Sequence, residues 1–139
     1  MTFDDFLGES LDNFTKGLDT SYNDFMGVLT DLQNAVSART HGNVTVKVSE
    51  VATTTEGSIY DLLVQKVGGF QPQTQRVASF QIGSSGYPIL VGDRIGNTLE
   101  SVRELTSKIQ LTDYIARQLK NSSSPLVVAV AYFSRKSGA

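Results

Sequence analysis

The chain has 139 residues, 40% of them hydrophobic and 19% charged, and its formal net charge is −2. This length and hydrophobic content are typical of one folded domain and exclude an intrinsically disordered chain. There is no cysteine and a single histidine, His41, so disulfides and thiolate ligands are excluded and no metal site is expected.

The beginning of the chain carries no targeting signal that we recognise. Its first ten residues, MTFDDFLGES, place acids where a secretory signal would carry positive charge. The longest apolar run, Leu126 to Phe133, has eight residues, whereas a membrane-spanning helix needs about 20. We therefore expect a cytoplasmic protein with no membrane partner.

Charge is divided unevenly along the chain. Residues 1–40 hold seven acids and two bases, a net charge of −5, and residues 41–139 hold seven acids and ten bases, a net charge of +3. A dedicated nucleic-acid-binding domain is usually strongly basic, so nucleic acid is not an expected partner. The two portions could attract each other within the fold, or they could meet different partners.

Apolar residues in the first 40 positions recur at helical spacing. They follow one another at intervals of three or four residues, with a mean of about 3.6, the period of a straight α-helix. These positions are Leu7, Leu11, Phe14, Leu18, Tyr22, Phe25, Leu29, Leu32 and Val36. Thr2 is suited to cap the helix start. One helix is predicted, with a break near Gly17 into two helices as the alternative.

This apolar stripe is the most unusual feature of the sequence, because four of the seven phenylalanines lie in the first 25 residues. Amphipathic helices usually bury such a stripe against their own domain. As a helix, however, the stripe would span roughly 45 Å, whereas a sheet of short strands is about 20 Å across. The excess length favours an interface with another protein or a second copy. The predicted interface residues are Phe3, Phe6, Leu7, Leu11, Phe14, Leu18, Tyr22 and Phe25.

The remaining residues predict mostly strands. Val44, Val46 and Val48 alternate with polar residues, which is the period of a half-buried strand. Further strands are predicted at 59–67, 76–82 and 87–91, although residues 59–67 could instead form a short helix. A helical segment is predicted from Asn97 to about residue 120, and the apolar run 126–133 predicts a buried final strand.

The predicted fold is therefore α+β. It has a mostly antiparallel sheet of about five strands, an N-terminal helix or two helices, and a second helical segment before the last strand. We expect a single domain over residues 1–139, with a helical segment at 1–40 and an α+β body at 43–134.

No catalytic constellation is evident, so we predict no catalytic residue, no cofactor and no enzymatic activity. The leading hypothesis is a non-enzymatic protein-interaction module, such as an adaptor, an inhibitor or immunity-type protein, or a subunit of a larger assembly. A small-ligand or nucleotide sensor is the alternative, with Asp93 and Arg94 of the 92–96 loop as its ligand-binding residues. In this hypothesis the start of the helix expected at Asn97 offers backbone N–H groups to an anion, and Arg94 assists. A second alternative is an enzyme that uses the carboxylates of Asp61 and Asp93.

Overall fold

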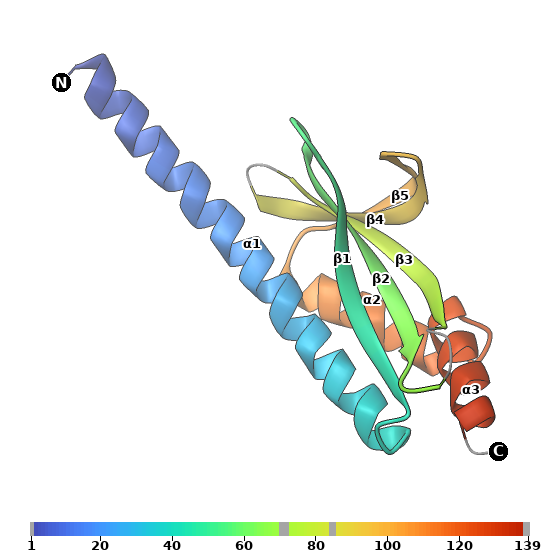
Figure 1. The fold of residues 1–139 in the computed structure, drawn as a ribbon. Helices are drawn as coiled ribbons and strands as arrows, with labels where there is room; N and C mark the ends of the chain where they lie inside the picture. The colour runs from blue at the N-terminus through green and yellow to red at the C-terminus, as the bar shows by residue number, and fades with distance from the viewer. Residues whose placement is uncertain (1, 70–72, 84–85, 138–139) are drawn as a thin grey trace.

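The computed structural model describes residues 2–69, 73–83 and 86–137. Eight elements follow one another along the chain (Figure 1). They are α1 (Phe3–Arg39), β1 (Val44–Thr54), β2 (Gly57–Lys66), β3 (Thr74–Gly83), β4 (Gly86–Ile95), β5 (Thr98–Leu105), α2 (Lys108–Lys120) and α3 (Pro125–Ser137). The predicted α+β class, the N-terminal helix and the five-stranded antiparallel sheet are confirmed.

The five strands form one antiparallel sheet in the order β1-β2-β3-β4-β5, so each strand pairs with the next along the chain. Residues 59–67 are predominantly strand, which confirms the hairpin interpretation over the short helix. All three helices contribute to a single core on one face of this sheet. Phe80 of β3 shows this arrangement, because its ring contacts Phe25 of α1 and Tyr114 of α2.

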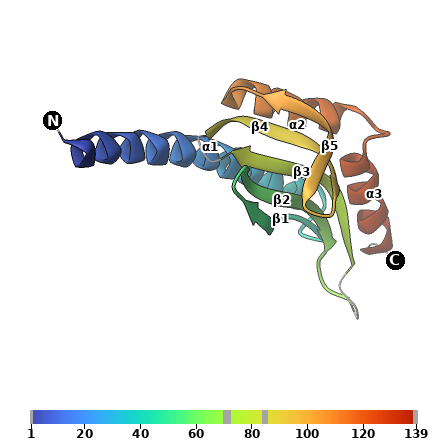
Figure 2. The same cartoon turned by 90° about the horizontal axis from the view of Figure 1, so that it is seen from above.

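Helix α1 runs for 37 residues without a break at Gly17. Thr2 and Asp5 form a reciprocal capping box at its start, which satisfies backbone groups that a helix end leaves open. The sheet covers only the second half of the helix. The buried residues in that half are Ser21, Phe25, Val28, Leu29, Leu32 and Val36. The first half extends past the sheet into solvent (Figures 1 and 2).

The prediction of a helix that begins at Asn97 is wrong, because residues 98–105 form strand β5. Gly96 adopts a φ of 62° and, with Asn97, makes the two-residue turn between the paired residues Ile95 and Thr98. A short Gly-Asn loop between two strand patterns is a hairpin signal. The helical segment starts only at Lys108, where Ser107 accepts a hydrogen bond from the Gln110 amide.

The predicted final strand over residues 126–133 is also wrong, because these residues belong to α3. Both later helices therefore follow the last strand. The Ser124 hydroxyl accepts a hydrogen bond from the Val127 amide, and Pro125 occupies the first helical position, where a missing N–H is tolerated. Every third or fourth residue of the run is buried. These residues are Leu126, Ala129 and Phe133. Among the described helices, none is both long and apolar enough to cross a membrane.

Candidate functional site

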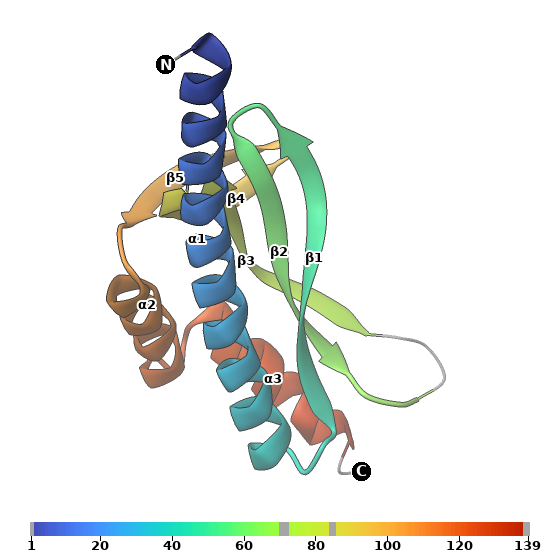
Figure 3. The ribbon, with the colours of Figure 1, turned by 90° about the vertical axis from the view of Figure 1, so that its left-hand side faces the viewer.

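Residues 3–20 form the projecting half of α1 (Figure 3), and large apolar side chains in its described part are exposed. Phe3 is 91% exposed, and Phe6, Leu7 and Leu11 are each more than half exposed. These four residues of the predicted interface set are accessible to a partner. The backbone of Phe14 and Leu18 continues the same helix, but their side chains lie outside the described part of the chain.

The two remaining residues of the predicted interface set lie where the stripe meets the sheet. Tyr22 is partly exposed and packs beside Tyr60, with ring centroids 6.3 Å apart. Phe25 is fully buried, and its ring centroid lies 5.1 Å from that of Phe80. Phe25 therefore belongs to the core, and the accessible stripe ends near Tyr22.

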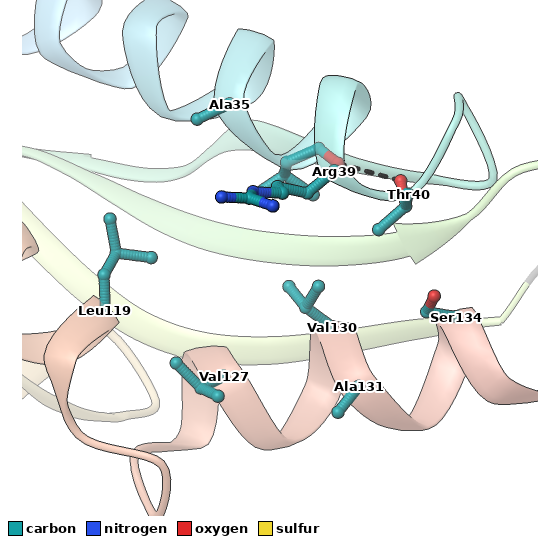
Figure 4. Close-up of a pocket in the computed structure, with 9 residues that line it drawn as sticks. Ala35, Arg39, Thr40, Leu119, Val127, Val130, Ala131 and Ser134 are labelled. Carbon is teal, nitrogen blue, oxygen red and sulfur yellow. Dashed lines mark hydrogen bonds between the residues drawn. The ribbon is translucent and has the colours of Figure 1, made fainter.

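An apolar groove of about 480 Å³ lies at the opposite end of α1 (Figure 4). Helix α1 forms one side of the groove and α3 the other, with Leu119 of α2 at one end. The lining residues are Ala35, Val36, Arg39, Thr40, Leu119, Val127, Val130, Ala131 and Ser134. The sequence does not reveal this groove, because the apolar run in α3 predicts a strand. The Ser124-Pro125 pair was the signal that could have placed a helix there.

Arg94, predicted as a ligand-binding residue, is instead held by Asp61 on the sheet face away from the helices. Arg94 Nε and Nη2 donate to the two carboxylate oxygens of Asp61, each over 2.8 Å, and Nη1 donates to the Gly96 carbonyl. The Ser79 hydroxyl also donates to Asp61 over 2.8 Å. Three of the five guanidinium N–H groups donate within the fold and the charge is paired with Asp61, so this cluster stabilises the sheet rather than presenting a free cation.

Burial alone would raise the pKa of the Asp61 carboxyl, since it disfavours the charged form. The hydrogen bonds from Arg94 and Ser79, together with the positive charges of Arg94 and Arg76, outweigh burial and lower this pKa below its usual value of 3.8. Asp61 is therefore a stable carboxylate at neutral pH. A general acid would need the opposite shift.

Asp93 lies apart from Arg94, although the two are neighbours in β4. It lines a polar cavity of about 340 Å³ between the sheet and the helices, together with Arg103, Tyr114 and Gln118. Burial raises the pKa of Tyr114, Arg103 acts to lower it and Asp93 acts to raise it. Asp61 and Asp93 face different surroundings, so they do not form an acid–base pair. The expected anion site beside a helix start at Asn97 does not exist, because β4 leads into β5.

Comparison with known proteins gives no relative from which a role could be transferred. No protein family model, no curated protein and no solved structure matches this chain. Within the described residues, no group of three or more His, Cys, Asp or Glu side chains is placed to hold a metal ion.

Proposed function

We propose that this protein is a non-enzymatic interaction module that associates with a protein through the projecting half of α1. The observation that carries the proposal is the exposure of Phe3, Leu7 and Leu11 along one stripe, with Phe6 exposed on a neighbouring face. The same stripe is buried further along the helix, where Phe25, Leu29 and Leu32 meet the sheet. A helix face of this kind is normally covered, and aromatic residues are enriched at the anchoring points of interfaces.

The substitution Leu11→Asp tests this proposal, with Asn13→Asp as its matched control. Both positions are exposed, both changes add one negative charge, and only Leu11 lies on the stripe. We expect Leu11→Asp to abolish association while its melting temperature stays within about 2 °C of wild type, since exposed substitutions change stability little. Light-scattering mass and circular-dichroism melting measure the two effects, and affinity capture from cell extract measures association with other proteins.

Asn13→Asp should associate as the wild type does. The proposal is overturned if two results occur together: the wild type stays monomeric, and Leu11→Asp captures the same proteins from cell extract as the wild type. It is equally overturned if Leu11→Asp and Asn13→Asp associate alike.

A small-ligand site in the polar cavity is a second candidate. Asp93, Arg103 and Tyr114 converge there from β4, β5 and α2, and they offer both charges and a hydroxyl. Binding of a small molecule should be weakened by Arg103→Gln and left unchanged by Leu11→Asp. Screening a metabolite library by thermal shift against both variants separates this function from association through α1.

A further inference from the structure

We infer that the partner of the projecting helix is a second copy of this chain, and that the helix docks into the groove between α1 and α3 of that copy. The inference rests on the proposed function and names its partner. It is carried by three features of the described residues: the position of the groove, the apolar character of its walls, and the distribution of charge.

The groove has the form that accepts an amphipathic helix. Two helices line it side by side, and Ala35, Ala131 and Ser134 are small residues that leave room between them. Val127 and Val130 supply apolar contacts from α3, and Val36 does so from α1. A helix that lies in such a groove inserts residues spaced three and four apart. Leu7 and Leu11 on the projecting half of α1 have this spacing and are exposed.

A chain cannot fill its own groove with its own projecting helix. Residues 3–20 and the groove residues Ala35 to Arg39 belong to one continuous helix. Figure 3 shows the N-terminal end of that helix far from α3, which lies beside its other end, where the groove residues Ala35 to Arg39 are. From Leu11 to Arg39 the helix rises about 40 Å, at about 1.5 Å per residue. Docking therefore requires a second molecule.

The projecting helix and the two later helices differ in the sign of their net charge in sequence. The projecting residues 3–20 hold five acids and one base, a net charge of −4. The acids are Asp4, Asp5, Glu9, Asp12 and Asp19, and the base is Lys16. Helices α2 and α3, over residues 108–137, hold five bases and one acid, a net charge of +4. The bases are Lys108, Arg117, Lys120, Arg135 and Lys136, and the acid is Asp113.

Charge also argues against the other symmetric arrangement, in which two projecting helices pair with each other. That arrangement would bring two surfaces of net charge −4 together. Arg39 lines the groove, so the docked helix would instead meet positive charge. Complementary charge of this kind favours one partner and one register over others.

Substitution within the groove tests the inference. Ala35 and Ala38 are both exposed on α1, but only Ala35 lines the groove. We expect Ala35→Glu to raise the self-dissociation constant at least about tenfold, because it adds bulk and a negative charge where an acidic helix docks. Ala38→Glu is the matched control and should leave that constant unchanged. Sedimentation equilibrium measures association, and circular-dichroism melting verifies that each variant is folded.

Mixing two variants gives a sharper result. Leu11→Asp keeps an intact groove, and Ala35→Glu keeps an intact projecting helix. Neither should self-associate, but an equimolar mixture should, because one functional helix then meets one functional groove. Added NaCl should weaken wild-type association, since it screens attraction between opposite charges. Pairing of two acidic helices would instead be strengthened by salt.

Three results would overturn the inference. Ala35→Glu could associate as the wild type does while Leu11→Asp does not, which would assign the contact to two projecting helices. The mixture could remain monomeric. Finally, the wild type could be monomeric while its helix captures a different protein, which would leave the proposed function intact. Failure of the proposed function is distinguished by Leu11→Asp having no effect on any association.

Discussion

Arg94 and Asp61 are joined by two parallel hydrogen bonds, Nε to Oδ1 and Nη2 to Oδ2, each 2.8 Å long. The pair links β4 to β2 across β3, and Ser79 of β3 donates to the same carboxylate. The side chain of Asp61 is only 7% exposed. A carboxylate buried to this extent is stable only while its partners remain in place.

We expect Asp61→Asn to lower the free energy of unfolding by about 2 kcal/mol, because hydrogen bonds to charged groups contribute about 1.5–3 kcal/mol. Asp113→Asn is the control, since Asp113 pairs with Arg117 on an exposed helix surface. That change should cost less than about 0.5 kcal/mol. Urea unfolding measures both. Equal effects for the two variants would contradict a stabilising role for the Asp61 cluster.

Acid should weaken the fold partly through Asp61. Its pKa in the folded protein is below the usual value of 3.8, so the unfolded chain takes up a proton first as the pH falls. The stability contributed by this group is present above the unfolded pKa and is lost as the pH falls through the folded pKa. Between about pH 5 and about pH 2 the wild type should therefore lose more stability than Asp61→Asn. Urea unfolding at a series of pH values checks this, and parallel curves would refute it.

Alkali should weaken the fold through Tyr87. Its hydroxyl donates to Asp24 over 2.6 Å and so connects β4 to α1. Burial, together with this bond to a carboxylate, raises the pKa of Tyr87. The unfolded tyrosine ionises near pH 10, so the stabilisation is complete below about pH 10 and is lost as the pH rises further. Tyr87→Phe should lower the free energy of unfolding by about 1–2 kcal/mol at neutral pH. It should also reduce the amount of stability that is lost when the pH rises above about 10. Tyr22→Phe is the control, and unfolding curves at pH 7 and 11 would show the difference.

Gly92 is required by the close approach of β5. A β-carbon at this position would lie 2.5 Å from the Glu100 carbonyl oxygen and 3.5 Å from the Val102 α-carbon. We expect Gly92→Ala to lower the free energy of unfolding by about 1–3 kcal/mol, because backbone must move. Gly27→Ala in α1 meets nothing within 4 Å and should raise stability by up to about 1 kcal/mol. Thermal unfolding of the two variants should give shifts of opposite sign.

Because α3 exposes one face and buries the other, we expect Asp substitutions at neighbouring residues to affect stability differently. Val128 is 52% exposed and Ala129 is 6% exposed. Val128→Asp should change stability by less than about 0.5 kcal/mol, whereas Ala129→Asp should unfold the domain or lower its stability by several kcal/mol, because it buries an unpaired charge. Circular dichroism measures both. A Val128→Asp variant that fails to fold would contradict the helix.

The sequence was informative where its periodicity was long or regular. Nine apolar positions from Leu7 to Val36 predicted a helix, and alternating valines from Val44 predicted a strand. The eight-residue apolar run from Leu126 is ambiguous, because its length fits a buried strand as well as a segment of a buried helix. Tertiary packing selects the helix. Its buried residues, Leu126, Ala129 and Phe133, are three and four positions apart, which is the spacing of one helix face and not the alternation of a strand.

The candidate site was predicted in part. The length of the apolar stripe predicts a helix longer than the sheet that covers it. In the structure Phe3, Phe6, Leu7 and Leu11 are exposed. The groove could not be predicted, because it requires the relative position of α1 and α3. The separation of Asp93 from Arg94 follows from strand alternation, which the expected loop at 92–96 had concealed.

The continuity of α1 has a consequence for how readily the projecting residues order themselves. An isolated 18-residue segment would have to nucleate a helical turn before growing, which is unfavourable in water. Here Phe25 and Leu29 fix the middle turns of the helix on the sheet, so the projecting residues extend a helix that has already begun. Their exposed apolar side chains are thus already held on a formed helix before any association of the kind proposed. Less conformational entropy remains to be lost on association, and a small contact area can then give measurable affinity.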